Sequence, residues 1–153
     1  DLDFGMRIRD NAEEEIERSL SLADDVSAIQ EDALEHMIRS EGIAPIIKRP
    51  RKSYEIGERE VVLGSLREGE SLFRQAKRRA NEVIRWWQLA ENAIEEGSKL
   101  LSGRDGEERQ NLRDLLTEAK EKLVAEKPPK AYEYATVIPI HLEGSTVATA
   151  QAE

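Results

Sequence analysis

The side chains of this chain that could do chemistry are basic residues gathered in the middle of an acidic sequence. The 153 residues carry a formal net charge of −9, yet residues 41–90 hold eleven Lys and Arg against seven Asp and Glu. Binding to a polyanion depends on local rather than total charge. We therefore predict phosphate contacts by the first basic group, with an ordinary solvated linker as the alternative. This group is Lys48, Arg49, Arg51 and Lys52.

A second basic group follows the outer side of a long predicted helix. With the apolar residues of that helix set at heptad positions a and d, Arg67 and Arg74 fall at position b. Arg78 and Arg85 fall at position f, so the four arginines form one stripe opposite the apolar seam. Glutamates lie close to this stripe. The stripe of arginines therefore predicts either contacts with nucleic acid or ion pairs with carboxylates of the protein assembly. Both interpretations stay open.

Catalytic and metal-binding residues do not occur in the patterns that such sites require. The chain has no Cys, which excludes disulfides, thiolate metal ligands and Cys nucleophiles. His36 and His141 lie on different predicted elements, and neither has a second ligand at helical spacing. No glycine-rich phosphate loop and no Gly-x-Ser-x-Gly turn is present. We predict that the protein is not an enzyme and needs no metal, cofactor or small-molecule substrate.

Composition indicates a helical protein with extensive solvated faces. Charged residues make up 36% of the chain and aromatic residues only 5%. No run of about 18 apolar residues occurs, so we predict no membrane span. The chain begins Asp1-Leu2-Asp3 without a Met, which indicates a processed or trimmed start.

The first part of the chain predicts a helical arm over residues 1–42, followed by an extended linker. The helix is expected over residues 10–39, where Asp10 and Glu13 resemble a capping box, with one possible break near residues 21–25. Residues 43–57 are predicted to form an extended basic linker. Pro45 and Pro50 lack amide donors and restrict the residues before them to extended geometry.

One long helix is predicted over residues 58–102, because its apolar residues alternate at spacings of four and three. This is the heptad rhythm of helices that pack side by side. Gly64, Gly69 and Gly97 are places where the helix could break. The seam and its flank predict contacts with a second copy or a partner helix. The interface residues expected there are Leu66, Phe73, Val83, Trp86, Trp87 and Ile94.

The rest of the chain predicts a third helix and a short β-prone tail. The third helix is expected over residues 107–126 and should fold back on the long helix, so that residues 58–127 form one region. Residues 128–153 contain many β-forming residues, with a candidate turn at Glu143-Gly144 that predicts a hairpin packed on a neighbouring subunit. The expected fold class is mainly α: a helical bundle with one long heptad-patterned helix, an extended basic linker and this tail.

This layout resembles the helical major capsid proteins of filamentous viruses of hyperthermophilic archaea. The resemblance covers the helical arm, the basic linker, the long helix with its four arginines, and the tail, although the arm is more acidic than DNA wrapping requires. It implies a structural protein of a virion that assembles with itself or a paralogous subunit. It also implies that the assembly coats double-stranded DNA through phosphate contacts, without sequence readout. Dense Glu and Arg without Cys are typical of thermophile proteins.

A different class of protein fits the same patterns. A cytoplasmic helical scaffold or adaptor would bind a protein partner through the heptad seam, and its basic stripe would form ion pairs. Nucleic acid that copurifies with the protein would favour the capsid interpretation over this alternative.

Overall fold

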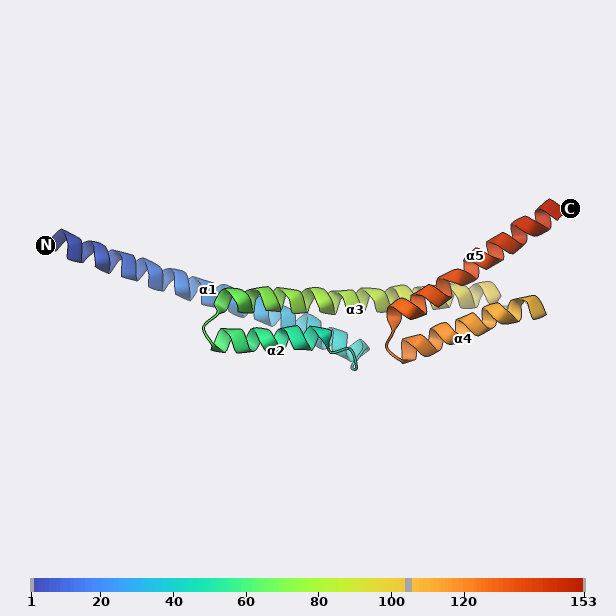
Figure 1. Cartoon of the computed structure of the whole chain (residues 1–153), viewed down its shortest axis with the longest axis horizontal. Helices are drawn as coiled ribbons and strands as arrows, with labels where there is room; N and C mark the ends of the chain where they lie inside the picture. Colours follow the sequence, from blue (N-terminus) through green and yellow to red (C-terminus); the bar gives the residue numbers. More distant parts are fainter. Residues whose placement is uncertain (1, 104–105, 153) are drawn as a thin grey trace. The chain divides into compact units, whose positions relative to one another are not determined.

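The chain is mainly α-helical, as predicted. The computed structural model describes the backbone of residues 2–103 and 106–152, and the side chains of residues 9–103, 106, 107 and 109–142. The residues that it describes contain no β-strand. The helices are α1 (Leu2–Ile43), α2 (Arg49–Val62), α3 (Leu66–Leu101), a 3-10 turn η1 (Glu107–Arg109), α4 (Gln110–Val124) and α5 (Pro128–Ala152) (Figure 1).

These helices belong to two compact units that share α3. The first unit comprises residues 1–41 and 48–81, so it contains α1, α2 and the first half of α3. The second unit comprises residues 42–47 and 82–153, which include the second half of α3 with α4 and α5. Each unit has its own apolar core.

Helix α1 is one continuous helix that begins earlier than predicted. It starts at Leu2, so the expected start at Asp10 and the break near residues 21–25 are wrong. Val26, Ala33 and Met37 recur at helical spacing and are fully or almost fully buried in the first unit. The helix ends at Ile43, just after Gly42.

The extended linker predicted over residues 43–57 is wrong, because α2 already begins at Arg49. Pro50 lies in the first turn of α2, where a missing amide donor costs no hydrogen bond inside the helix. The amide of Lys52 donates to the carbonyl of Lys48 at 2.9 Å, which closes the first turn. Pro50 therefore starts a helix that we expected it to prevent.

The turn between α2 and α3 divides the long helix that was predicted to begin near residue 58. Gly64 has a φ of +89°, a left-handed conformation that glycine adopts at little cost. Its amide donates to Val61 O at 3.0 Å, and the Ser65 amide donates to Glu60 O at 2.8 Å. These two bonds form a Schellman motif, which ends α2 and satisfies its last carbonyls. The break at Gly64, one of three considered, is confirmed.

The core of the first unit forms where α1, α2 and α3 meet. The ring of Tyr54 on α2 packs against the ring of Phe73 on α3, with their centroids 5.3 Å apart. A Cβ atom at Gly57 would lie 2.8 Å from the Phe73 ring, so only glycine lets α2 approach α3 this closely. The remaining buried members of this core are Val26, Ala33, Met37 and Ala76.

The core of the second unit forms between α3, α4 and α5. The predicted third helix is confirmed as η1 and α4, which together cover residues 107–124. Ile138 of α5 is fully buried, and its side chain lies opposite Gly97 of α3. The buried members of this core are Leu101, Leu112, Leu116, Ile138 and Leu142.

The β-hairpin predicted for the tail is wrong, since α5 covers the tail through residue 152 as one helix. Its buried residues are spaced by four, three and four, which is a helical and not a strand period. Pro139 lies inside α5, where its ring removes one backbone hydrogen bond. Packing on the second unit thus overrides both the β propensity and the proline. The buried residues are Ala131, Ala135, Ile138 and Leu142.

Candidate nucleic-acid and self-assembly surfaces

The first predicted basic group lies on the first turn of α2 rather than on an extended strand. Lys48 is the N-cap residue of the helix, and Lys48, Arg49 and Lys52 are exposed. None of the three forms an ion pair or side-chain hydrogen bond with a described residue. Lys48 and Lys52 are four residues apart, so they share one side of the helix. Three of the four residues of this first basic group are therefore free of ion pairs and lie close together.

Arg51, the fourth residue of this group, is engaged within the first unit. Its Nε and Nη2 donate to the two carboxylate oxygens of Glu41 at 2.6 and 3.0 Å. Its Nη1 lies 3.8 Å from the carboxylate of Glu55. The hydrogen bond to Glu41, followed by the charges of nearby carboxylates, raises the pKa of Arg51 above its ordinary value. Arg51 ties α2 to the end of α1, and its Nε and Nη2 donor pair is not free for a phosphate.

The stripe of arginines on α3 is only partly available. Arg74 donates to Glu70 at 3.0 and 3.2 Å, as the ion-pair interpretation expects. Arg67 and Arg78 are exposed and have no described ion-pair partner. Arg85 is exposed as well but lies in the part of α3 that belongs to the second unit.

Two polar contacts inside the first unit have partners that were not predicted from the sequence. Arg79 of α3 donates to the buried hydroxyl of Ser53 at 2.8 Å, which joins α3 to α2. Lys77 donates to the carboxylate of Asp32 at 2.5 Å, which joins α3 to α1. The same hydrogen bond is the main reason that the pKa of Asp32 lies below 3.8. The spacing of these residues along the chain holds no signal for either pair, because each joins separate helices.

The first half of the predicted interface seam packs inside the chain itself. Phe73 is fully buried in the first unit, so it is a core residue and offers no surface to a second copy. Leu66 is half-buried against the same core. Val83 is also buried. The heptad rhythm of α3 therefore reflects helices of the same chain.

The second half of the seam keeps one open surface. The rings of Trp86 and Tyr132 pack in a T-shaped arrangement with their centroids 5.6 Å apart, and this contact joins α3 to α5. Trp87 is only half-buried, and its indole Nε1 donates to Glu91 at 2.8 Å. Ile94 is half-buried on the same side of the helix. Within the chain itself, Trp87 is therefore not fully buried.

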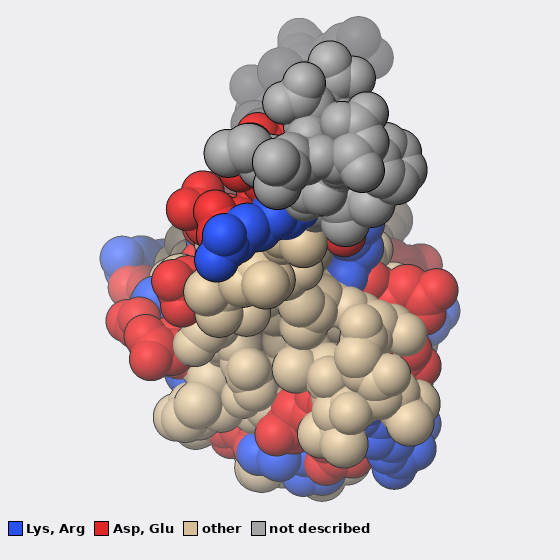
Figure 2. All heavy atoms as spheres, turned by 90° about the vertical axis from the view of Figure 1, so that its left-hand side faces the viewer, with Lys and Arg blue, Asp and Glu red and all other residues tan. Residues whose placement is uncertain are grey.

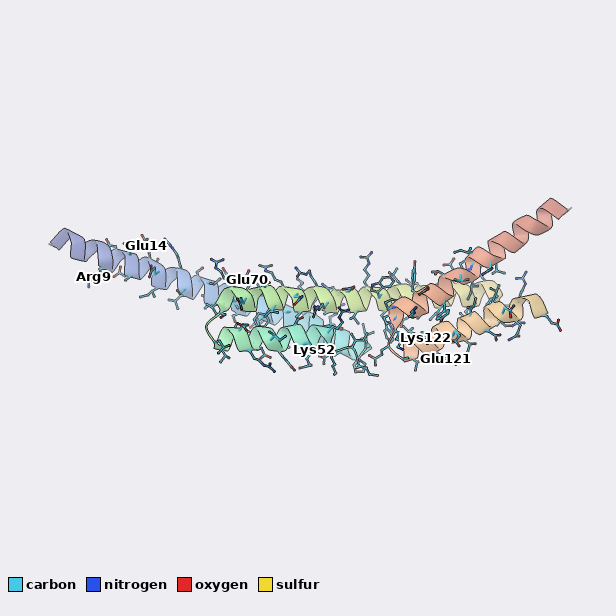
Figure 3. The ribbon with its side chains drawn as sticks, viewed as in Figure 1. Arg9, Glu14, Lys52, Glu70, Glu121 and Lys122 are labelled. Carbon is cyan, nitrogen blue, oxygen red and sulfur yellow. The ribbon has the colours of Figure 1, made fainter. Side chains whose placement is uncertain are left out.

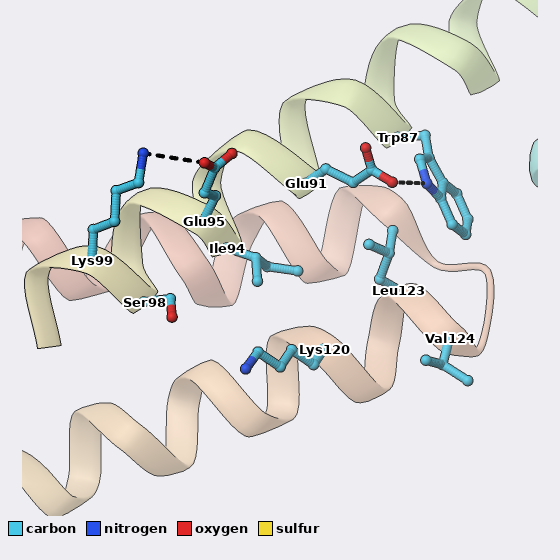
Figure 4. Close-up of a pocket in the computed structure, with 9 residues that line it drawn as sticks. All are labelled: Trp87, Glu91, Ile94, Glu95, Ser98, Lys99, Lys120, Leu123 and Val124. Carbon is cyan, nitrogen blue, oxygen red and sulfur yellow. Dashed lines mark hydrogen bonds and ion pairs between the residues drawn. The ribbon is translucent and has the colours of Figure 1, made fainter. Parts of the chain in front are cut away.

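Trp87 and Ile94 line a groove between α3 and α4 with a volume of about 600 Å³ (Figure 4). Leu123 and Val124 of α4 add apolar surface, and 82% of Val124 is exposed. The rim carries charges of both signs, including the ion pair between Lys99 and Glu95 at 3.1 Å. Such an apolar floor with a charged rim suits a helix or a large apolar side chain. The residues at the rim are Glu91, Glu95, Lys99 and Lys120, with Ser98 between them.

The N-terminal part of α1 is an exposed surface of the first unit. Figure 1 shows that α1 extends beyond the turn between α2 and α3, and Arg9 and Glu14 lie on this projecting part (Figure 3). All side chains from residue 9 to residue 21 are exposed. Ile16 and Leu20, one helical turn apart, are 59% and 62% exposed. We call residues 9–25 the arm.

Further exposed apolar residues lie on α2 and its turn. Ile56 is 44% exposed, and Val62 and Leu63 are 86% and 76% exposed. Val62 and Leu63 border a shallow groove of about 540 Å³ on α2. Figure 2 looks at the molecule from the side of the arm and shows uncharged side chains gathered between acidic and basic ones.

The described residues contain no set of groups that would bind a metal ion. Within the same residues, no helix has both the length and the apolar character that a membrane crossing requires. Comparison of the chain with known protein families, curated proteins and solved structures finds no match. Function must therefore be inferred from the surfaces of the chain itself.

Proposed function

We propose that this chain is a structural protein that assembles with copies of itself through its helices. The observation that carries this proposal is the arm, a helical segment whose residues 9–21, including Ile16 and Leu20, are all exposed and belong to neither described core. Most helical stability in proteins comes from packing an amphipathic face. An unpacked segment of this length is therefore expected to gain its packing from another chain.

Sedimentation velocity over a range of micromolar concentrations tests this proposal. We expect the sedimentation coefficient to rise with concentration, because contacts between copies are populated by mass action. A variant without residues 1–21 should remain a folded monomer, since every residue of either described core lies outside this segment. A full-length chain that stays monomeric at all concentrations would contradict self-assembly.

We further propose that the assembly coats double-stranded DNA, as in the capsid proteins that the chain resembles. This part is supported by Lys48, Arg49 and Lys52, which are exposed on one helical turn without carboxylate partners among the described residues. Arg67 and Arg78 are available in the same unit. Such cations would contact phosphates and would not distinguish base sequence.

Salt dependence of binding tests the DNA proposal. Each neutralised phosphate contributes about −0.9 to the slope of log K against log salt on duplex DNA. The double variant K48Q/R49Q should therefore bind with a shallower slope. Arg74→Gln is the matched control, because Arg74 already pairs with Glu70 and should change the slope little. Equal slopes for the parent and the double variant would exclude this surface as the DNA contact.

A protein-binding scaffold is the second candidate function, and the groove between α3 and α4 favours it. Trp87 and Ile94 are residues of the predicted seam, and they line this groove together with Leu123. A partner helix could bury them there, whether or not DNA is present. Val124→Asp would place a charge on the groove wall. Loss of self-assembly in this variant, with DNA binding absent in the parent, would favour the scaffold.

A further inference from the structure

We propose that the arm of one copy packs antiparallel on the outward face of α2 in a second copy, centred on Leu20 against Ile56. This inference rests on the proposed self-assembly and names its contact. The proposed contact is inferred from two exposed surfaces, an acidic one on the arm and a basic one on α2. Each carries an apolar residue between its charged residues.

The acceptor is the side of α2 that faces away from its core, which we call the outward face. Ser53, Tyr54 and Gly57 are buried on the opposite side of the helix. The outward residues follow spacings of four, three and four, so they form one stripe along the helix. All four are exposed and have no described ion-pair partner. They are Lys52, Ile56, Arg59 and Leu63.

Carboxylates also flank the outward face and bear on its charge. Glu55 lies beside it, but its carboxylate is 3.8 Å from Nη1 of Arg51. Glu58 lies farther round the helix and borders the shallow groove with Val62 and Leu63. Glu60, one turn after Ile56 and half-buried, borders the face on its other side. The stripe itself contains no carboxylate and carries Lys52 and Arg59 on either side of Ile56.

The donor is the arm, which is acidic and also carries exposed apolar residues. Residues 9–25 carry seven Asp and Glu against two Arg, a net charge of −5. Ile16 and Leu20 lie on one side of the helix, and Glu13, Glu17 and Asp24 follow their edge. Only Glu14, on another side, pairs with an arginine of the arm, Arg18 at 3.5 Å.

The spacings on the two helices match when the helices run antiparallel. Asp24 is four residues after Leu20, and Lys52 is four residues before Ile56. Glu17 is three residues before Leu20, and Arg59 is three residues after Ile56. One apolar contact is thus bracketed by two opposite-charge pairs, Asp24 with Lys52 and Glu17 with Arg59. Such pairs set the orientation and register of helices that pack together.

The arm cannot reach this face within its own chain. It projects from the end of the first unit that carries the turn between α2 and α3, whereas Lys52 lies toward the other end of α2 (Figure 3). Because α1 is one continuous helix, the arm cannot fold back along α2. The two surfaces differ, so the contact is head-to-tail. Contacts of this kind build open filaments unless the rotation between copies closes them into a ring.

Charge reversal tests the contact with a matched control. The arm variant E13K/E17K/D24K should raise the concentration needed for half-maximal assembly by at least about tenfold, since attraction becomes repulsion. The control E14K/E15K/D25K makes the same change of charge on the other sides of the arm and should assemble nearly as the parent does. Equal effects of both variants would overturn the proposed face, since only net charge would then matter.

Mixing two defective variants makes the test specific for a head-to-tail contact. The face variant K52E/R59E should also fail to assemble alone, because its face repels the acidic arm. In a mixture, the reversed arm meets the reversed face and the parental arm meets the parental face, so assembly should return. A mixture that remains monomeric, while the parent assembles, would overturn the contact and leave self-assembly intact. If the parent protein does not assemble at all, both the proposed contact and the proposed self-assembly are overturned.

Introduced thiols test the register independently, since the chain contains no Cys of its own. A mixture of L20C and I56C should form a disulfide-linked dimer under mild oxidation, and so should a mixture of D24C and K52C. The pair E17C and K52C would crosslink only if the helices were parallel. Crosslinking of this last pair in preference to D24C with K52C would overturn the antiparallel arrangement. Circular dichroism of each variant checks that its helix content is unchanged.

Discussion

Arg51 holds Glu41 through two parallel hydrogen bonds of 2.6 and 3.0 Å, and this pair links the end of α1 to the start of α2. The pair is partly exposed, with 39% of the Arg51 side chain and 21% of the Glu41 side chain accessible. Solvent therefore weakens it relative to a buried pair. The pair still occupies the Nε and Nη2 edge of the guanidinium, which is then not available to a phosphate.

The first prediction is a measurable coupling between these two residues. A double-mutant cycle with Arg51→Gln and Glu41→Gln should give about 1 kcal/mol in urea unfolding, near the upper end for exposed pairs because the geometry is bidentate. Arg51→Lys should lose part of this coupling, since Lys cannot form the two parallel bonds. A coupling of zero would contradict the structural role of the pair.

The second prediction concerns the close approach of α2 to α3. Gly57→Ala should lower the free energy of unfolding by about 1–3 kcal/mol, because its methyl group would lie 2.8 Å from the Phe73 ring. Gly42→Ala is the control, since a Cβ atom there meets nothing within 4 Å. Alanine at this helical position should stabilise by up to about 1 kcal/mol. Similar effects of both substitutions would contradict the packing described.

The third prediction is a pH dependence caused by Asp32. Lys77 lowers the pKa of the Asp32 carboxyl below 3.8, so the ionised form is favoured in the folded state. The resulting stability is fully present above the unfolded pKa of 3.8 and is lost as the pH falls through the lower folded pKa. Asp32→Asn should therefore destabilise the protein at neutral pH and flatten the loss of stability below about pH 4.

Urea unfolding at several pH values measures this effect. Glu31→Gln is the matched control, because Glu31 is exposed on the same helix and has no described ion-pair partner. If Asp32→Asn and Glu31→Gln follow the same curve, the contact between Asp32 and Lys77 contributes nothing to stability.

The fourth prediction distinguishes a helix from a hairpin in residues 128–142. Ile138 is fully buried and Ile140 is 67% exposed, although they are only two positions apart in the sequence. Ile138→Ala should destabilise the second unit by about 2–5 kcal/mol, and Ile140→Ala should stay within about 0.5 kcal/mol of the parent. In a strand both side chains would point to one face and the two variants would behave alike. Thermal unfolding decides between these outcomes.

The fifth prediction concerns the relative contributions of the two tryptophans, Trp86 and Trp87, to stability. Trp86→Ala should destabilise the second unit more than Trp87→Ala, because Trp86 packs against Tyr132 whereas Trp87 lines an open groove. The aromatic contact adds about 0.5–1.5 kcal/mol to the burial of area. Urea denaturation of the two variants measures the difference, and a larger loss for Trp87→Ala would support burial of Trp87 in an assembly.

The sequence by itself determined that this chain is helical and where most of its apolar faces lie. Periods of three and four in α1, α3 and α4 are local properties, and they survive in the structure because a helix places such residues on one side. The break at Gly64 was also readable, since glycine adopts the positive φ that ends a helix. These features depend only on neighbours along the chain.

The tertiary structure decided what those faces pack against and which helices form at ambiguous segments. Pro50 predicted a linker, but it occupies the first turn of a helix, where its missing amide has no cost. The β-forming tail became helical because Ala131, Ala135 and Ile138 bury against the second unit. Likewise, Arg51 and Lys77 form ion pairs with Glu41 and Asp32, which lie on another helix. Burial and ion pairs between distant segments outweigh local propensity, and only the folded chain brings those segments together.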